Sequence, residues 1–230
     1  MPIVAFVVLV AGVYFAYLIF SQDYNSRSLQ VPSVTYADGY DTVPQEELLK
    51  IINAKNMVEA SYKPQLTEVE CVEINTLAAE KLTELLEAAK AEGLQLELIT
   101  GYVTYEKQTE LYEAEKNRLI TKNGLSVIRA EADAKKTVPQ GGASEAQSGM
   151  LVTFASKNGG VFSKTPESNW LENHCTDYGF VLRYPQNHEN DTQMNYNSQV
   201  YRYVGTKNAA NMRSYGMCLN EYHNHVIYGE

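Results

Sequence analysis

Between residues 76 and 92, apolar side chains recur at every third or fourth position. The members of this stripe are Ala78, Leu82, Leu85, Leu86 and Ala89. This spacing places them on one face of a helix. Asn75 or Thr76 offers an N-cap, and Gly93 offers the glycine that commonly follows a helix. The pattern therefore predicts an amphipathic helix over residues 76–92.

Strict alternation follows this helix. Leu94, Leu96 and Leu98 alternate with polar residues, which predicts a half-buried strand. The same reasoning predicts further helices and strands along the chain. The helices are expected over residues 105–120, 126–135, 170–178 and 208–215, and the strands over 150–154, 180–184 and 200–204. Helices and short strands in mixed order predict an α+β domain with a small antiparallel sheet flanked by helices.

The chain begins with an apolar run that has no polar face, from Ile3 to Phe20. This run is just long enough to cross a bilayer as a helix. Its last residues are bulky, whereas a signal-peptide cleavage site requires small ones, so a retained anchor is favoured over a cleaved signal. A polar segment containing prolines and glycine follows. We expect a transmembrane anchor at residues 1–22, a tether at 23–47 and one folded domain at 48–230.

Charge and cysteine content narrow the function classes. The chain has 19 basic and 28 acidic residues, and no Lys/Arg run occurs, which argues against nucleic-acid binding. Cys71, Cys175 and Cys218 are too few and too scattered for a disulfide scaffold. They are expected to be small core residues, although a Cys175–Cys218 bridge stays open if the domain faces an oxidising space.

Five segments, in order, resemble the VanY-type D-alanyl-D-alanine carboxypeptidases, a branch of the LAS metallopeptidases. Residues 51–64 (INAKN, then YKP) are similar to the usual opening of that domain. Residues 100–108 (TGYVTYEKQ) are similar to its S-G-Y-R-S-Y-x-x-Q, and 142–149 (GASEAQSG) to its G-T-S-E-H-Q-T-G. Residues 170–185 and 201–205 are similar to its W-L…Y-G-F-x-L-R-Y-P and to the end of E-P-W-H-x-R-Y-V-G. The resemblance covers residues 49–225 and implies a single VanY-like domain of the hedgehog/DD-peptidase type.

The resemblance also implies a zinc site that this sequence does not reproduce. The family binds zinc through two histidines and an aspartate and uses a glutamate as general base. The matching positions are Ala146, Thr153 and Val200 for the ligands and Asn197 for the base. The family arginine that contacts substrate carboxylate is matched by Val103, which has no guanidinium group. We therefore expect no catalytic residues, no bound metal and no cofactor, although the family uses zinc.

Other residues of the family motifs outline a cleft that could still bind a ligand. The tentative ligand-binding residues are Tyr102, Ser144, Gln147, Tyr196, Arg183 and Arg202. The two arginines are either buried partners of carboxylates or cations lining the cleft. Tyr105 and Tyr201 are expected to join Tyr102 and Tyr196 in a stacking surface for a peptide or sugar.

Four histidines are the remaining metal-binding candidates. His223 and His225 could share a face if they lay on a strand or an extended tail, but exposed polar residues near a chain end explain them better. His174 is expected on a helix surface, and His188 stands apart from the other three.

Three functional hypotheses follow. The first is a catalytically inactive, membrane-anchored relative of the carboxypeptidases, on the extracytoplasmic side of the cell membrane. It would bind a peptidoglycan stem peptide or a cell-wall or membrane protein. The second is an active metallo-carboxypeptidase with an unconventional metal site, which trims D-alanine from stem peptides. The third is a structural part of a membrane assembly that makes its contacts through the N-terminal helix.

Overall fold

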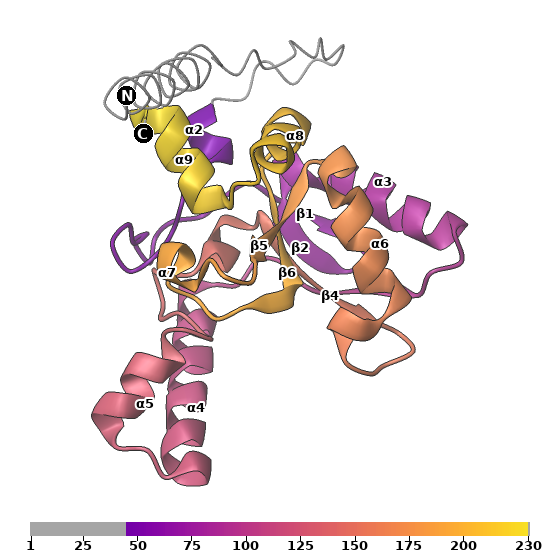
Figure 1. The fold of residues 1–230 in the computed structure, drawn as a ribbon. Coiled ribbons are helices and arrows are strands. Elements are labelled where there is room, and N and C mark those ends of the chain that lie inside the picture. Colours follow the sequence, from indigo (N-terminus) through magenta and orange to yellow (C-terminus); the bar gives the residue numbers. More distant parts are fainter. Residues whose placement is uncertain (1–44, 230) are drawn as a thin grey trace, which may run out of the picture. The chain divides into compact units, whose positions relative to one another are not determined.

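A four-stranded antiparallel sheet forms the centre of the structure, a computed structural model that describes residues 45–229 (Figure 1). Its strands lie in the order β3 (Leu96–Thr100), β4 (Leu151–Ser156), β6 (Asn197–Tyr203) and β5 (Phe180–Tyr184). Each neighbouring pair is antiparallel. A second sheet is the hairpin of β1 (Leu66–Val69) and β2 (Val72–Asn75).

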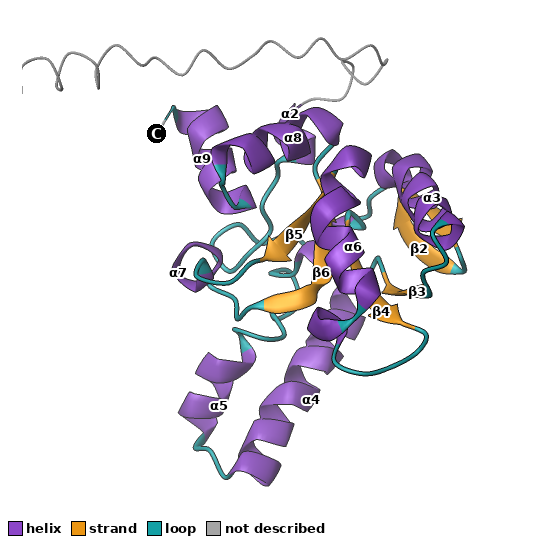
Figure 2. Ribbon diagram, turned by 45° about the vertical axis from the view of Figure 1, so that its right-hand side comes forward, coloured by secondary structure: helices purple, strands orange, loops and turns teal. Residues whose placement is uncertain are grey.

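Helices surround these two sheets. They are α2 (Gln45–Leu48), α3 (Thr76–Ala91), α4 (Tyr105–Asn123), α5 (Val127–Ala134), α6 (Pro166–His174), α7 (Glu189–Thr192), α8 (Thr206–Tyr215) and α9 (Leu219–Tyr228). Figure 2 shows α6 beside the central sheet, while α4 and α5 run out from it side by side. The α+β class with small antiparallel sheets flanked by helices is thus confirmed.

One face of the central sheet carries the main hydrophobic core. Side chains alternate between the two faces of a strand, so every second residue of β4 and β6 points to this face. Val152 and Phe154 from β4 and Tyr201 and Tyr203 from β6 lie there, together with the apolar stripe of α3 and with Trp170 and Leu171 of α6. Their burial removes the largest apolar surface of the domain from water, which is the dominant force that holds α3 and α6 on the sheet.

The opposite face of the sheet receives the remaining side chains of the same strands. Val200 and Arg202 of β6 and Val181 and Arg183 of β5 alternate with the core residues and so point to this face. Val181 packs with α8 and α9 in a second apolar cluster. The family motifs meet on this face.

The elements predicted from periodicity are mostly confirmed. Helix α3 spans the predicted range, with Asn75 as its N-cap, and buries all five stripe residues. Strand β5 has the predicted bounds. Helix α4 ends at Asn123, three residues beyond the predicted end, and Gly124 follows it in the left-handed conformation. The predicted helix over residues 170–178 begins earlier, at Pro166, and continues from His174 as a 3-10 turn to Gly179.

The N-terminal predictions lie largely outside the described residues. The anchor at 1–22 and most of the tether at 23–47 fall within residues 1–44, and the last residues of the tether belong to α2. Within residues 45–229 no helix combines the length and the apolar character needed to cross a bilayer.

The cysteine prediction is partly wrong. Cys175 and Cys218 are buried, as expected of small core residues, but Cys71 is exposed in the turn between β1 and β2. All three are free thiols, so the Cys175–Cys218 bridge that the sequence left open is not formed.

Candidate functional site

The turn of residues 142–149 lies at the centre of the candidate site and is held by its own side chains. The Gln147 carboxamide oxygen accepts a hydrogen bond from the Gly142 N–H at 2.7 Å, and the Ser148 hydroxyl donates to the Glu145 carbonyl at 2.6 Å. The Ser144 hydroxyl accepts from the Ala146 N–H at 3.3 Å. Ser144 and Gln147, both predicted ligand contacts, are therefore buried and bound to the turn itself.

Gly149 ends this turn where it meets the β1–β2 hairpin. Its φ of +68° lies in the left-handed region, and a Cβ atom there would come within 2.8 Å of the Asn75 backbone nitrogen. The Asn75 N–H donates to the Gly149 carbonyl at 2.8 Å, and its side chain donates to the Ser148 carbonyl at 3.0 Å. A residue with a side chain would push these two segments apart.

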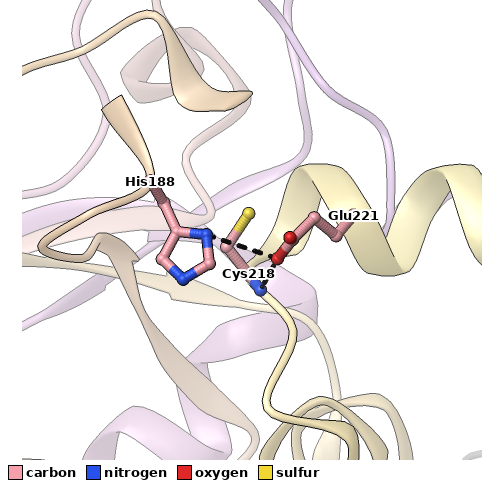
Figure 3. Close-up of side chains that lie close together, drawn as sticks. All are labelled: His188, Cys218 and Glu221. Atoms are coloured by element: carbon pink, nitrogen blue, oxygen red, sulfur yellow. Dashed lines mark hydrogen bonds and ion pairs between the residues drawn. The ribbon is translucent and has the colours of Figure 1, made fainter. Parts of the chain in front are cut away.

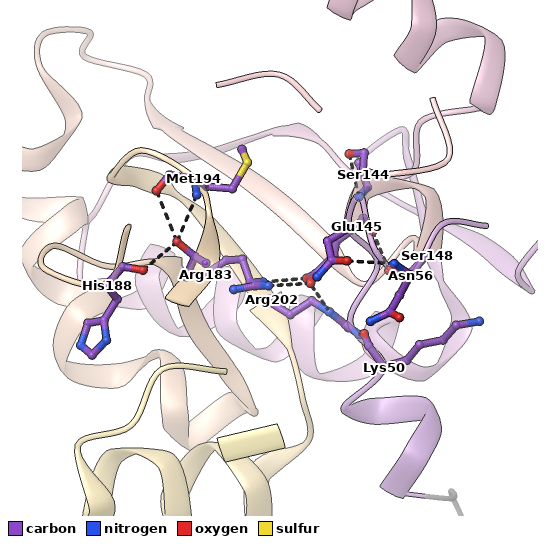
Figure 4. Close-up of polar contacts among 12 residues, drawn as sticks. Lys50, Asn56, Ser144, Glu145, Ser148, Arg183, His188, Met194 and Arg202 are labelled. Atoms are coloured by element: carbon purple, nitrogen blue, oxygen red, sulfur yellow. Dashed lines mark hydrogen bonds and ion pairs between the residues drawn. The ribbon is translucent and has the colours of Figure 1, made fainter. Parts of the chain in front are cut away.

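Glu145 forms a buried ion network with two arginines of the neighbouring strands (Figure 4). Its carboxylate accepts two hydrogen bonds from Arg183, at 2.7 and 2.8 Å, in the bidentate geometry that guanidinium groups favour. The Arg202 Nε lies 3.3 Å from the same carboxylate. Arg202 also donates to the carbonyls of Tyr203, Leu48 and Lys50, so it joins the start of the domain to β6.

The two arginines respond differently to this burial. Burial disfavours both guanidinium charges, but the charge and hydrogen bonds of Glu145 outweigh it for Arg183 and raise the Arg183 pKa. For Arg202 burial prevails and lowers the pKa, because the contact with Glu145 is weaker and the charge of Arg183 is close. Of the two alternatives that the sequence left open for these arginines, the structure favours buried partners of a carboxylate.

An apolar cluster occupies the space beside this network. Ala146, Leu151, Tyr184 and Val200 are buried against one another, with Val103 and Met194 packed at the edge. Ala146 comes from the turn, and the Val103 N–H donates to its carbonyl at 3.2 Å. Positions 103, 146 and 200, which the resemblance matches to the family site, therefore pack together in one cluster.

Thr153 and Asn197 lie on the strands that form the floor of this cluster. Thr153 pairs with Val200 across β4 and β6 and with Thr100 across β3 and β4. Asn197 pairs with Tyr184 at the start of β6, and its side-chain oxygen accepts a hydrogen bond from the Gln199 N–H at 3.0 Å. Thr153 therefore adjoins the cluster, whereas the Asn197 oxygen is committed to the backbone.

The predicted stacking surface of tyrosines is only partly present. Tyr102, Tyr105 and Tyr196 are half-buried, but Tyr201 is fully buried and packs edge-on against Phe154 in the main core. The expectation for Tyr201 is wrong because β6 turns that residue to the opposite face of the sheet. Burial, followed by the nearby charges of Glu106 and Glu73, raises the pKa of the Tyr102 hydroxyl above its ordinary value.

Three of the four histidines lie as expected, and His188 does not. His223 and His225 lie on α9, where residues two apart point in different directions, so they share no face. His174 lies on the surface of α6 and stacks on Trp170, as expected of a helix-surface residue. His188 lies beside Cys218 and Glu221 (Figure 3), a grouping that the sequence did not indicate because His188 is far from the other two along the chain.

The chain is similar to known carboxypeptidases. Residues 72–206 match the family model described as VanY, D-alanyl-D-alanine carboxypeptidase. The chain is 27% identical to the putative carboxypeptidase YodJ of Bacillus subtilis strain 168, over 88% of this chain and 77% of that protein. It is 32% identical to a D-alanyl-D-alanine carboxypeptidase of Enterococcus faecalis, over 78% of this chain and 67% of that protein.

Solved structures of carboxypeptidases have the same fold as this chain. The structure of VanYB in complex with D-alanine-D-alanine aligns with a TM-score of 0.70 at 30% identity, covering 76% of this chain and 97% of that chain. The structure of the LD-carboxypeptidase LdcB aligns with a TM-score of 0.66 at 27% identity, covering 82% of this chain and 92% of that chain.

Proposed function

Because the chain belongs to the VanY family of D-alanyl-D-alanine carboxypeptidases, we propose that it is a catalytically inactive member that binds a peptidoglycan stem peptide. The apolar cluster of Ala146, Leu151, Tyr184 and Val200 carries this proposal. Alanine and valine have no atom that can bind a metal. In the resemblance to the family, two of these residues stand where the zinc-binding histidines are expected.

The remaining positions support the same conclusion. Thr153 offers only a neutral hydroxyl, a poor zinc ligand, and Asn197 offers an amide oxygen that hardly accepts a proton. Val103 lacks the guanidinium group that would bind a terminal carboxylate. The residues present therefore do not fit the family zinc ion, and no catalytic step is assigned to it.

Two observations support a stem peptide as the ligand: the ligand of a related protein, and the exposed surface of two tyrosines. The related protein VanYB has been solved in complex with D-alanine-D-alanine. In this chain the half-buried Tyr102 and Tyr196 retain surface for a peptide to stack on. The network of Glu145, Arg183 and Arg202 would keep the turn and strands in place without touching the ligand.

The cellular setting is also a proposal. The apolar run from Ile3 to Phe20 would anchor the domain to the cell membrane with a single pass, on the extracytoplasmic side where stem peptides occur. Partition of the full chain into the membrane fraction, with the domain open to added protease in spheroplasts, is the expected result. Recovery of the chain in the soluble cytoplasmic fraction would overturn it.

Activity is tested by incubating the zinc-supplemented full chain with a synthetic pentapeptide that ends in D-Ala-D-Ala. We expect no D-alanine release above a protein-free control. Metal-dependent release would overturn the proposal in favour of an active carboxypeptidase with an unconventional metal site.

Binding is tested by titrating the same peptide into the chain and following heat or NMR shifts. We expect saturable binding that weakens in Tyr102→Ala and Tyr196→Ala, with Tyr228→Ala, a change of an exposed tyrosine on α9, as the control. Absence of binding by the folded chain would exclude the stem peptide as ligand. Equal binding by all variants would exclude the tyrosine surface.

A further inference from the structure

Three potential metal ligands from two distant segments meet at the docking point of α9 (Figure 3). His188 precedes α7, Cys218 precedes α9, and Glu221 lies in the first turn of α9. One ligand atom of each lies within 4.8 Å of the ligand atoms of the other two. Among residues 45–229 this is the one group of three or more such side chains that is close enough to hold an ion.

His188 supplies an independent observation, because its Nδ1 atom is buried and makes no hydrogen bond. That atom lies 3.4 Å from a carboxylate oxygen of Glu221 and 3.4 Å from one of Asp191. A neutral imidazole that turned its lone pair to two carboxylates would be repelled by them. Nδ1 therefore carries either a hydrogen, as in one neutral tautomer of imidazole, or a bound cation that the two carboxylates also face.

The spacing of the His188 nitrogen and the two carboxylates fits a metal ion between them, and the Cys218 ligand atom lies within 4.8 Å of those of His188 and Glu221. Ligand atoms about 2.0–2.1 Å from a tetrahedral zinc lie roughly 3.3–3.4 Å apart, which is the separation found on both sides of the His188 nitrogen. The Glu221 carboxylate is held in position by accepting the Cys218 N–H at 2.8 Å. Its oxygens retain lone pairs for a metal.

We propose that His188, Cys218 and Glu221 form a binding site for a thiophilic divalent metal ion such as zinc, with Asp191 or water as a fourth ligand. Nitrogen, sulfur and carboxylate ligands together are typical of zinc. On binding, the Cys218 thiol loses its proton to solvent and a sulfur–metal bond forms, with no oxidation or reduction. The thiolate and one carboxylate balance the two charges of the ion.

Burial, together with the neighbouring Glu221 carboxylate, raises the pKa of the free Cys218 thiol, so its thiolate forms only with a cation beside it. The thiol is buried, and its charge would lie close enough to Arg183 to raise the pKa of that guanidinium group. Arg183 belongs to a network in which two arginines share the single charge of Glu145. A negative sulfur beside this network offsets its surplus positive charge.

The site shares no residue with the apolar cluster at Ala146 and Val200. A metal here would fasten α9 to the segment that follows β5, because Cys218 and Glu221 come from one and His188 from the other. The proposed role of the metal is structural. The metal site can therefore be tested independently of the proposed lack of peptidase activity.

The test is zinc retention by the full chain after loading with excess zinc and desalting. We expect about one zinc per chain for the natural sequence, and at least about ten-fold weaker binding in Cys218→Ser and His188→Gln. Thr153→Ala and the double variant His223→Gln/His225→Gln are controls that should keep the zinc. Cobalt in place of zinc should give a sulfur-to-metal charge-transfer band that Cys218→Ser removes.

Several results would overturn the metal site. They are zinc well below one per chain in the natural protein, equal retention in Cys218→Ser and His188→Gln, or a cobalt spectrum without a sulfur band. Circular dichroism of the metal-free variants checks that each one folds. Zinc should also raise the melting temperature of the natural chain but not that of Cys218→Ser, since a ligand that binds only the folded state stabilises it.

Discussion

At the scale of single residues, the turn of residues 142–149 contains two kinds of position: residues that hold the fold together, and a residue that the resemblance matches to the family zinc site. Glu145 and Gly149 are framework positions, one joining two strands by charge and the other allowing close backbone approach. Ala146 belongs to the chemistry of the family site, and here it is part of an apolar cluster. The sequence alone predicts that Ala146 binds no metal ion, because a methyl group cannot be a metal ligand in any fold. It left the role of Arg183 and Arg202 open, because only the fold shows that both reach one carboxylate.

Replacing Glu145 with Gln should destabilise the domain strongly. The change leaves two buried guanidinium groups without a counter-charge, and breaking a buried ion pair in this way costs about 3–5 kcal/mol. Chemical denaturation with urea measures the loss. The matched control is Glu115→Gln, which breaks a surface pair with Arg118 and should have a far smaller effect. Equal losses in the two variants would contradict the structural role given to Glu145.

Replacing Gly149 with Ala should also destabilise the domain, by more than the same change at Gly124. Both glycines have φ near +67°, so each alanine suffers the left-handed strain of about 1–2 kcal/mol. Only at Gly149 would the new Cβ also meet backbone, at Asn75, whereas nothing lies within 4 Å at Gly124. The difference in unfolding free energy between the two variants isolates the close approach. If the two variants lose the same stability, the turn and hairpin are not in tight contact.

At the scale of elements, segments with a clear apolar period or a glycine at the end were predictable, and several short segments without such a signal were not. Helix α3 follows from its apolar stripe and its caps. The hairpin of β1 and β2 escaped prediction because its turn consists of Glu70 and Cys71, both with positive φ, where an Asn-Gly pair is the usual signal. Helix α9 was not predicted either, since Cys218 is an unusual N-cap.

Glu167, in the first turn of α6, should make a pH-dependent contribution to stability. Burial raises the pKa of its carboxyl group, but the N–H of Gln95, its own N–H and the hydroxyls of Ser156 and Thr165 outweigh this and lower the pKa. A lowered folded-state pKa contributes stability above the unfolded value of about 4.3, and this contribution is lost as the pH falls through the folded-state value.

The variant Glu167→Gln tests this contribution. At pH 7 we expect a loss of about 1–3 kcal/mol, because a charged acceptor of buried N–H groups is replaced by a neutral one. The difference from the natural chain should shrink as the pH falls below about 4. Urea unfolding at several pH values measures it. A difference that stays constant down to pH 2 would show that the Glu167 charge is not the cause.

At the scale of the whole molecule, the proposal is that this chain keeps the fold of the family without its zinc chemistry. Ordered motifs predicted the fold from the sequence, and the central sheet brings positions 103, 146, 153 and 200 together as those motifs imply. The grouping of His188, Cys218 and Glu221 could not be predicted, because it depends on how α9 docks beside α7 and on no sequence motif. A domain of this kind can keep its framework while its function moves from catalysis to binding.

D-alanine release tests the central claim most directly, and it is decisive even if zinc is held elsewhere. The full natural chain and the variant Ala146→His/Thr153→Asp/Asn197→Glu/Val200→His are each loaded with zinc and given the pentapeptide. The account predicts no release by the natural chain. Any release by the variant would show that the framework still supports the chemistry. Release by the natural chain that disappears on metal removal would contradict the account and establish an active carboxypeptidase.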